Sequence, residues 1–182
     1  MYKDINPKKN SKIKNVYIIN GIIQISNSKQ IYSLSSSKIK NIKSFYFQNL
    51  TIDGNILKQI MSLGLDIVDD FYFIECYFKD LNILSTINYS KNLGFIKCGL
   101  YLEDFAYLFS WFKDWNNLET LDLSGNKLGI QQMEFFKWLN MNLWNKIYIN
   151  KLILSDNNFS EIFEQRMISN NEWFKSFDEI IF

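Results

Sequence analysis

The sequence predicts a mixed α/β fold in which short strands and helices alternate along the chain and the strands form one parallel sheet. Two observations lead to this prediction. The apolar pattern L-x-x-L-x-L-x-x-N-x-L occurs twice in the C-terminal half, and segments with apolar residues at helical spacing lie between its copies. The 182 residues are enough for one domain, and a hydrophobic fraction of 47% is enough for a continuous core.

The clearest copy of the pattern runs from Leu118 to Leu128, and a second copy runs from Ile149 to Phe159. Residues 121–123 read Leu-Asp-Leu, so both leucines lie on one face of a short strand. Asn126 follows that strand, where its side chain can bond backbone groups that the turn leaves without partners. Because losing such a buried bond costs about 1–3 kcal/mol, we interpret this asparagine as structural.

The spacing resembles that of the leucine-rich repeat family. Degenerate copies extend in both directions, with first positions at residues 42, 68, 90, 118, 149 and 177. Units of this length with a helix after each strand resemble the ribonuclease-inhibitor-like subclass. The resemblance implies a leucine-rich-repeat solenoid of about six strand-turn-helix repeats over residues 42–182. It also implies a parallel sheet on the concave face and binding by that curved surface.

Helices are expected between the strands, because apolar residues recur there at helical spacing. The expected helices are Asn55–Leu63, Asp80–Ile87, Glu103–Trp115, Ile130–Trp144 and Ser160–Asn170.

Residues 15–41 precede the repeats and are predicted to form a hairpin cap and a loop. Apolar residues from Val16 to Ile25 flank Asn20-Gly21, and Asn-Gly between apolar runs is the strongest short-range hairpin signal. Such a β-hairpin would cover the first repeat, which has no neighbour on one side. Residues 26–37 are serine-rich and read as a loop. A degenerate first repeat is the alternative to the cap, with template positions at Ile13, Val16, Ile18 and Ile23.

Both cysteines, Cys76 and Cys98, fall on the polar column of the template. In the subclass this column often holds Cys or Asn, which implies a structural role for both. A disulfide is an alternative, because neighbouring strands lie about 4.8 Å apart. Half of a metal site is another, but it would need further ligands in a chain without histidine. A reduced pair in an intracellular protein is the simpler expectation.

The register predicts which side chains lie on the open face of the strands. The middle row should read Tyr46, Tyr72, Gly94, Asp122, Ile153 and Ile181. The row before it should read Ser44, Asp70, Asn92, Thr120, Lys151 and Glu179, and the row after it Gln48, Ile74, Ile96, Ser124 and Ser155. The candidate partner-binding residues of this concave face are Tyr46, Tyr72, Ile74, Ile96, Asp122 and Ile153.

Tyrosine-rich patches suit protein recognition. Alternatively, these residues are there because aromatic and β-branched side chains pack well across strands. The C-terminal strand is a second candidate contact, because Ile180–Phe182 would leave an open sheet edge. Trp173, Phe174 and Phe177 could fold over that edge, or a partner could cover it.

The net charge of +1 hides an uneven distribution. Residues 1–43 hold nine lysines and one acid, whereas residues 44–182 hold 11 basic and 18 acidic residues. The basic N-terminal arm, residues 1–14, carries the densest group: Lys8, Lys9, Lys12 and Lys14. It reads as a solvated tail, as a phosphate-binding arm that contacts rRNA or other RNA, or an acidic protein, or as a mitochondrial transit peptide. The absence of arginine from the arm argues against the last reading.

A chain without histidine excludes Ser-His-Asp and Cys-His nucleophile pairs and histidine-ligated zinc. The paired carboxylates Asp69-Asp70 flank a strand, and Glu103-Asp104 stand where a helix should begin, which suits its dipole. We therefore expect no enzymatic activity, no cofactor and no metal.

No apolar run approaches the roughly 18 residues of a membrane span, and the N-terminus has no secretory signal. We expect an intracellular protein, in the cytoplasm or in mitochondria. The hypothesis is a non-catalytic protein-binding module, an adaptor or structural subunit of a larger assembly. The alternative is a ribosome- or RNA-associated factor that uses the basic arm.

Overall fold

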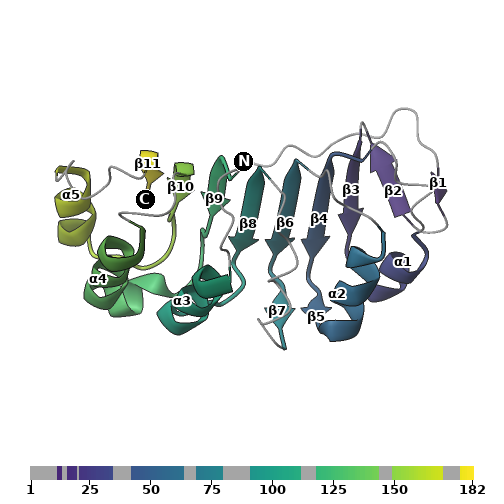
Figure 1. Ribbon diagram of the computed structural model, residues 1–182, viewed down its shortest axis with the longest axis horizontal. Helices are drawn as coiled ribbons and strands as arrows, with labels where there is room; N and C mark the ends of the chain where they lie inside the picture. The colour runs from purple at the N-terminus through teal and green to yellow at the C-terminus, as the bar shows by residue number, and fades with distance from the viewer. Residues whose placement is uncertain are drawn as a thin grey trace.

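The computed structural model shows a mixed α/β chain whose strands form one large, mainly parallel sheet (Figure 1). It describes residues 12–13, 16–19, 21–34, 42–63, 69–79, 91–111, 118–143, 149–169 and 177–182. Within these residues the strand order is β1-β2-β3-β4-β6-β8-β9-β10-β11. The strands are β1 (Lys12–Ile13), β2 (Val16–Ile19), β3 (Ile22–Ile25), β4 (Ser44–Gln48), β6 (Asp70–Ile74), β8 (Asn92–Ile96), β9 (Thr120–Asp122), β10 (Ile149–Ile153) and β11 (Phe177–Ile181).

The seven strands from β3 to β11 run parallel and keep one register. Residues paired across successive strands form the row Gln24, Tyr46, Tyr72, Gly94, Asp122, Ile153 and Ile181. From Tyr46 onward this is the row that the sequence pattern predicts, so the predicted register is confirmed.

One side of the sheet is buried. Residues along a strand alternate between its two faces, so every second side chain of a strand lies on this side. In β4, Phe45 and Phe47 are fully buried, whereas Tyr46 between them is half-buried. Phenylalanines of neighbouring strands stack on this side: the ring centroids of Phe47 and Phe73 lie 5.2 Å apart, and those of Phe73 and Phe95 lie 5.5 Å apart. Phenylalanine therefore fills the core at positions where the template has leucine.

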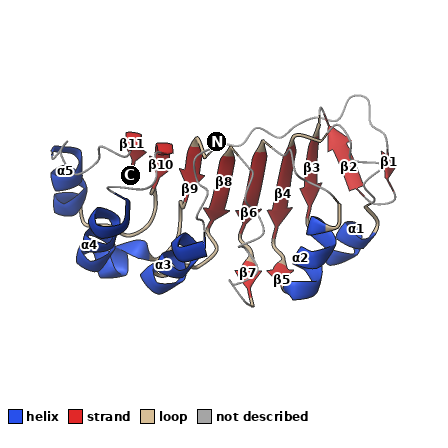
Figure 2. Ribbon diagram, in the orientation of Figure 1, coloured by secondary structure: helices blue, strands red, loops and turns tan. Residues whose placement is uncertain are grey.

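The helices gather along one side of the sheet and follow the order of the strands (Figure 2). They are α1 (Ser28–Tyr32), α2 (Gly54–Met61), α3 (Leu102–Trp111), the 3₁₀ turn η4 (Leu128–Gln131), α4 (Gln132–Leu143) and α5 (Glu161–Ser169). Helices are thus confirmed at four of the five predicted places, and the fifth, Asp80–Ile87, lies outside the described residues.

Helix α1 corrects the prediction that residues 26–37 form a loop. The Asn27 side chain accepts a bond from the Lys29 backbone N–H at 2.9 Å, and the Gln30 side chain accepts one from the Asn27 backbone N–H at 3.0 Å. This capping box stabilises the first turn, and Ile31 anchors the helix in the core with no exposed surface. The serine content of the segment concealed these two signals.

The predicted hairpin is confirmed, because β2 and β3 pair antiparallel next to Gly21, whose φ is 80°. Strand β3 then pairs parallel with β4. The strand that joins the parallel sheet is thus Ile22–Ile25. The degenerate-repeat alternative would have placed residues 16–18 in the parallel sheet. It is wrong, because Ile22–Ile25 pairs with β4 there.

A second, two-stranded sheet follows the ends of β4 and β6. It pairs β5 (Thr51–Ile52) with β7 (Tyr77–Phe78), and the sequence pattern did not indicate it.

Candidate binding face

A row of left-handed residues turns the chain out of each strand. Asn49, Glu75, Lys97, Gly125 and Asp156 follow five parallel strands, and each has φ between 53° and 69°. In the first four, the backbone N–H donates to the carbonyl of the residue just before the next turn residue of the row, as from Lys97 to Ser124 at 2.8 Å. Two of the five, a glutamate and a lysine, are residues that rarely adopt this conformation. The turns therefore have one shape although their sequences differ.

The polar column follows directly after this row and holds the turns together from inside. The Asn126 side chain, 2% exposed, donates to the carbonyls of Phe95 at 2.6 Å and Leu123 at 2.7 Å. Its oxygen accepts the backbone N–H groups of Cys98 and Leu100, both at 3.1 Å. The structural role predicted for this residue is confirmed.

Asn157 repeats this arrangement one turn further along. It donates to the carbonyls of Leu123 and Leu154, both at 2.8 Å, and it is 1% exposed. Each asparagine thus joins its own strand to the preceding one, so the two turns are bonded to each other through side chains as well as backbone.

Cys76 and Cys98 occupy the same column. The Cys76 thiol donates to the Phe47 carbonyl at 3.3 Å, and the Cys98 thiol donates to the Phe73 carbonyl at 3.5 Å. The carbonyls of Phe47 and Phe73 occupy the same position on their strands as those of Phe95 and Leu123, which accept bonds from Asn126 and Asn157. Burial raises the pKa of both thiols, that of Cys98 to about 12. Both cysteines are free, so the structural reading agrees with the geometry.

The predicted partner-binding residues lie on the side of the sheet opposite the buried phenylalanines. We call this side the tyrosine face and define it by the three rows that contain Ser44, Tyr46 and Gln48. The rings of Tyr46 and Tyr72 stack with centroids 5.1 Å apart and an interplanar angle of 6°. Gly94 makes room for this stack, because a Cβ atom there would lie 2.2 Å from Cδ1 of Tyr72.

The other predicted residues of the tyrosine face differ in exposure. Ile74 and Ile153 are half-buried, like the two tyrosines, whereas Ile96 is 6% exposed and Asp122 is 7% exposed. Asp122 accepts bonds from the Ser124 backbone N–H at 2.9 Å and from its hydroxyl at 2.5 Å. Four of the six predicted residues, Tyr46, Tyr72, Ile74 and Ile153, therefore keep accessible surface.

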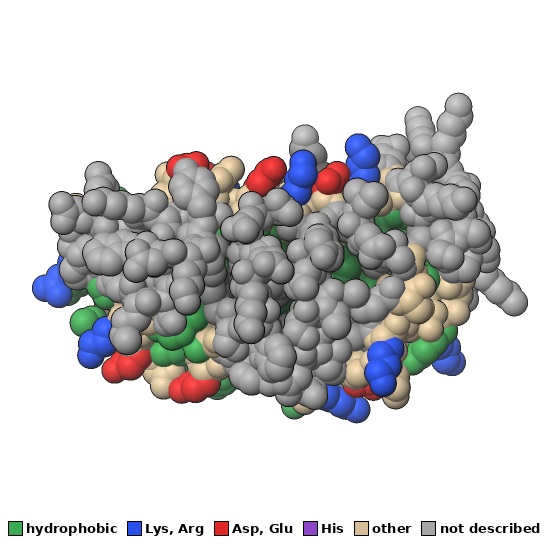
Figure 3. All heavy atoms as spheres, viewed as in Figure 1, with side chains coloured by type: hydrophobic (Ala, Val, Ile, Leu, Met, Phe, Trp, Pro, Cys, Tyr) green, Lys and Arg blue, Asp and Glu red, His purple; other side chains and the backbone are tan. Residues whose placement is uncertain are grey.

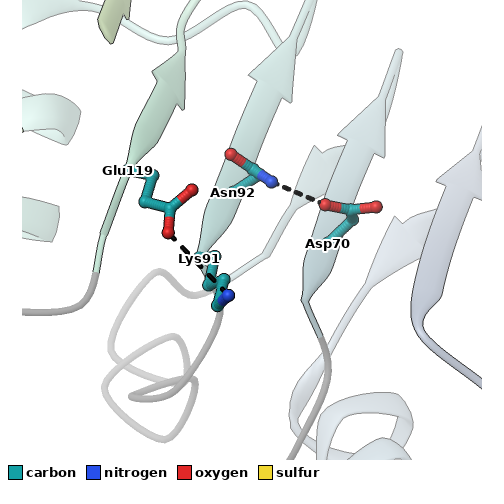
Figure 4. A network of polar contacts seen from close by, with 4 residues as sticks. All are labelled: Asp70, Lys91, Asn92 and Glu119. Atoms are coloured by element: carbon teal, nitrogen blue, oxygen red, sulfur yellow. Dashed lines mark hydrogen bonds and ion pairs between the residues drawn. The ribbon is translucent and has the colours of Figure 1, made fainter. Parts of the chain in front are cut away.

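A polar network that the sequence analysis did not find lies in the row below the tyrosines. Asp70 accepts a bond from the Asn92 side chain at 2.7 Å (Figure 4). It accepts another from the Ser44 hydroxyl at 2.5 Å, so it links three strands. The register placed these residues side by side, but their hydrogen bonds depend on rotamers that the pattern does not specify.

Charges alternate along the edge where the parallel strands begin, which Figure 3 shows as neighbouring acidic and basic side chains at its upper edge. The residues in register there are Lys43, Asp69, Lys91 and Glu119. Lys91 Nζ lies 3.8 Å from Glu119 Oε1, and both side chains are exposed (Figure 4). Exposed pairs of this kind add little stability, but like charges in a shifted register would repel.

Strand β11 lies at the C-terminal end of the sheet. It pairs with β10 on one side, where Lys151 Nζ and Glu179 Oε2 form an ion pair at 2.9 Å. Within the described residues no strand pairs with its other side. The rings of Phe182 and Phe159 meet edge to face at 5.8 Å, which ties the end of β11 to the core. Trp173 and Phe174 lie outside the described residues.

The basic arm falls largely outside the described residues, which include Lys12 but not Lys8, Lys9 or Lys14. Lys12 belongs to the two-residue strand β1, where it pairs with Tyr17 of β2. The role of the four lysines therefore stays a prediction.

The described residues contain no group of three or more His, Cys, Asp or Glu side chains that could hold a metal ion.

The pair Glu103 and Asp104 lies in the first turn of α3, as predicted, and Asp104 accepts the Tyr101 backbone N–H at 2.9 Å. A hydrogen bond from the Gln131 side chain lowers the pKa of Glu103. This carboxylate thus favours its ionised form, which suits a helix start.

No described helix is long and apolar enough to cross a membrane.

Comparison with known families gives one match: a model described as Leucine Rich Repeat matches residues 117–139. The match supports a leucine-rich repeat protein. It covers the strand β9, the turn with Asn126 and most of α4, so it includes the clearest copy of the pattern, Leu118 to Leu128. Leucine-rich repeats are usually non-catalytic binding modules, so the match suggests a protein-interaction module. No curated protein matches the chain.

Proposed function

We propose that this chain is a non-catalytic protein-binding module that acts as an adaptor or structural subunit of a larger intracellular assembly. The binding surface is the tyrosine face, and the outer side of β11 is a second contact. The solenoid of about six repeats spans residues 42–182, the hairpin cap spans 15–41, and the tyrosine face is its concave side. The ribonuclease-inhibitor-like subclass belongs to the same proposal.

The observation that carries this proposal is the Tyr46–Tyr72 stack on the side of the sheet away from the phenylalanine core. Tyrosine supplies a large contact area with a polar end at a small cost in conformational entropy, which is why binding surfaces are rich in it. Seven parallel strands about 4.8 Å apart span roughly 29 Å, enough for an ordinary interface of about 800 Å² per partner.

Sedimentation of a native extract tests the proposal. Tagged wild-type chain, a Tyr72→Ala variant and an Ile74→Asp variant are each run on a density gradient. Tyr77→Ala is the matched control, because Tyr77 is 65% exposed in β7, away from the tyrosine face. We expect wild type and the control to migrate with a larger particle and the two face variants to migrate as free chain. Comigration of the face variants with wild type would contradict the proposal.

The charge asymmetry of the chain favours a second candidate function, an RNA-associated factor that contacts phosphate through Lys8, Lys9, Lys12 and Lys14. Nuclease treatment of the same extract separates the two functions. Phosphate contacts would make the particle sensitive to nuclease and salt, with a log-log salt slope of roughly one unit per contact. Replacing Lys8, Lys9 and Lys14 by glutamine would then release the chain, whereas Tyr72→Ala would leave it bound.

A further inference from the structure

The charged side chains of the tyrosine face indicate what a partner must present to it. Over β4, β6, β8 and β9 the three rows of this face hold two charged residues, Asp70 and Asp122, and both are acids. Asp70 is half-buried and Asp122 is 7% exposed. This part of the face is therefore negative, in a chain region whose overall charge is also negative.

Both carboxylates are held by neutral donors among the described residues. Asp70 accepts from Ser44 and Asn92, and Asp122 accepts from the N–H and hydroxyl of Ser124. Such bonds fix the position of a carboxylate but leave its charge uncancelled.

The described lysines near these strands include Lys43, which stands in register with Asp69 just before β4 begins, and three that are engaged elsewhere. Lys91 pairs with Glu119 (Figure 4) and Lys151 pairs with Glu179, so both lysines have acidic partners other than Asp70 and Asp122. Lys97 lies in the turn row, where its side chain covers Gly125. The two aspartates thus present negative charge to whatever covers the face.

The ring of Tyr72 lies near both of these residues. It occupies the space above Gly94, and Gly94 pairs with Asp122 on the next strand. Asp70 precedes Tyr72 by two residues on the same strand and the same side of the sheet, about 7 Å away along the backbone. An aromatic ring beside carboxylates is the arrangement that holds lysine or arginine, with the alkyl stem on the ring and the charge near the acids.

We propose that the tyrosine face binds an extended segment of a partner protein that carries lysine or arginine side chains. One of these cations lies over Tyr72, between Asp70 and Asp122, and apolar neighbours of the segment contact Tyr46 and Ile74. The inference rests on the proposed function and adds to it the chemistry of the partner. Charge complementarity selects this occupant, because an acidic segment would meet two like charges.

A labelled peptide tests the inference on the full chain. The probe has about nine residues, with lysine and leucine taking turns at every second position and serine between them, and it spans the roughly 29 Å of the face at about 3.4 Å per residue. A peptide with glutamate in place of lysine is its control, and binding is measured by fluorescence anisotropy at low and high salt. We expect the lysine peptide to bind and the glutamate peptide not to bind. Equal binding of both peptides would overturn the inference.

Matched variants separate this site from general charge attraction. Asp70→Asn with Asp122→Asn removes two charges but keeps hydrogen-bond acceptors. The control, Glu134→Gln with Asp156→Asn, removes two exposed charges outside the tyrosine face. We expect the first pair to weaken binding about tenfold or more and the control to change it less than about twofold. Equal loss in both would overturn the inference.

The ring is tested separately, because Asp122→Asn could disturb the turn. Tyr72→Phe should leave affinity within about twofold, whereas Tyr72→Leu should weaken it severalfold, since a cation over a ring contributes about 0.5–2 kcal/mol. Unchanged affinity in Tyr72→Leu would count against a cation at this ring.

Carbodiimide cross-linking identifies the occupant, because it joins a lysine amine to a neighbouring carboxylate. We expect mass spectrometry to find the peptide linked to Asp70 or Asp122. Links from Lys8 or Lys9 of the same chain, or from a second copy, in place of the peptide would overturn the inference. If the Tyr72→Ala variant leaves its particle but the lysine peptide does not bind, the proposed function stands and the basic partner is wrong.

Discussion

The buried side chains of the polar column stabilise the fold by bonding backbone groups that a turn cannot satisfy itself. Asn126 meets two carbonyls and two N–H groups from two successive turns. A thiol meets only carbonyls, and it does so at longer distances, as Cys98 shows at 3.5 Å. The column is therefore strongest around Asn126 and Asn157 and weaker at the cysteines.

Asn126→Ala should lower the free energy of unfolding by about 2–4 kcal/mol, because it leaves several buried backbone groups without partners. Asn150→Ala, at an exposed position of β10, is the control and should change stability by less than about 0.5 kcal/mol. Urea unfolding monitored by circular dichroism measures both. Similar losses in the two variants would show that the side-chain bonds of the polar column do not contribute this part of the free energy of unfolding.

The Cys98 thiol should make stability depend on pH in the alkaline range. Burial raises its pKa from 9.0 to about 12, so the folded chain keeps this proton at pH values where the unfolded chain loses it. Its contribution to stability is full below pH 9 and is lost as the pH rises toward 12. The difference in free energy of unfolding between wild type and Cys98→Ala should therefore shrink over that range. A constant difference would mean that the thiol is not desolvated.

The turns are the elements that keep the repeated strands in register, and they hold strain where the residue is not glycine. Glu75 has φ 53°, a conformation that costs an L-residue about 1–2 kcal/mol. Gly125 occupies the equivalent position at φ 69° without that cost.

Glu75→Gly should raise the free energy of unfolding by about 0.5–1 kcal/mol, the relief of strain less the entropy that glycine loses on folding. Glu75→Ala is the control at the same position and should show no such gain, because alanine keeps the strain. Thermal unfolding of the two variants decides the point. A gain that is equal in both would assign the effect to loss of the carboxylate instead.

Gly94 and Tyr72 are coupled across β6 and β8. Gly94→Ala should cost about 1–3 kcal/mol, because the new methyl group meets the Tyr72 ring. In the Tyr72→Ala background the same substitution should cost much less, since the ring is gone. A double-mutant cycle from denaturant unfolding measures this coupling, and additive effects would contradict the close contact.

For the whole molecule, the sequence pattern was sufficient to predict the parallel sheet and its middle row. Period-two alternation fixes which residues share a face, and the clear copies around Asn126 and Asn157 set the register for the weaker ones. The pattern did not indicate helix α1, whose capping signals stand in a serine-rich segment. It also missed the left-handed turn positions at Glu75 and Lys97, because neither residue type signals that conformation.

The tyrosine face could be predicted only in part. Its residues followed from the register, but exposure did not: Ile96 and Asp122 are nearly buried, while Tyr46, Tyr72 and Ile74 retain surface. The Asp70 network depends on side chains from three strands, and the pattern of one strand carries no information about such bonds.

Site-specific photo-crosslinking tests whether the tyrosine face contacts a protein partner. A photoreactive residue is placed at position 74 on this face or at position 77 on β7, and the full chain is irradiated in cells. We expect a covalent protein adduct from position 74 that is absent from position 77 and is lost when Tyr72→Ala is added. Equal adducts from both positions, or adducts from position 77 alone, would contradict it.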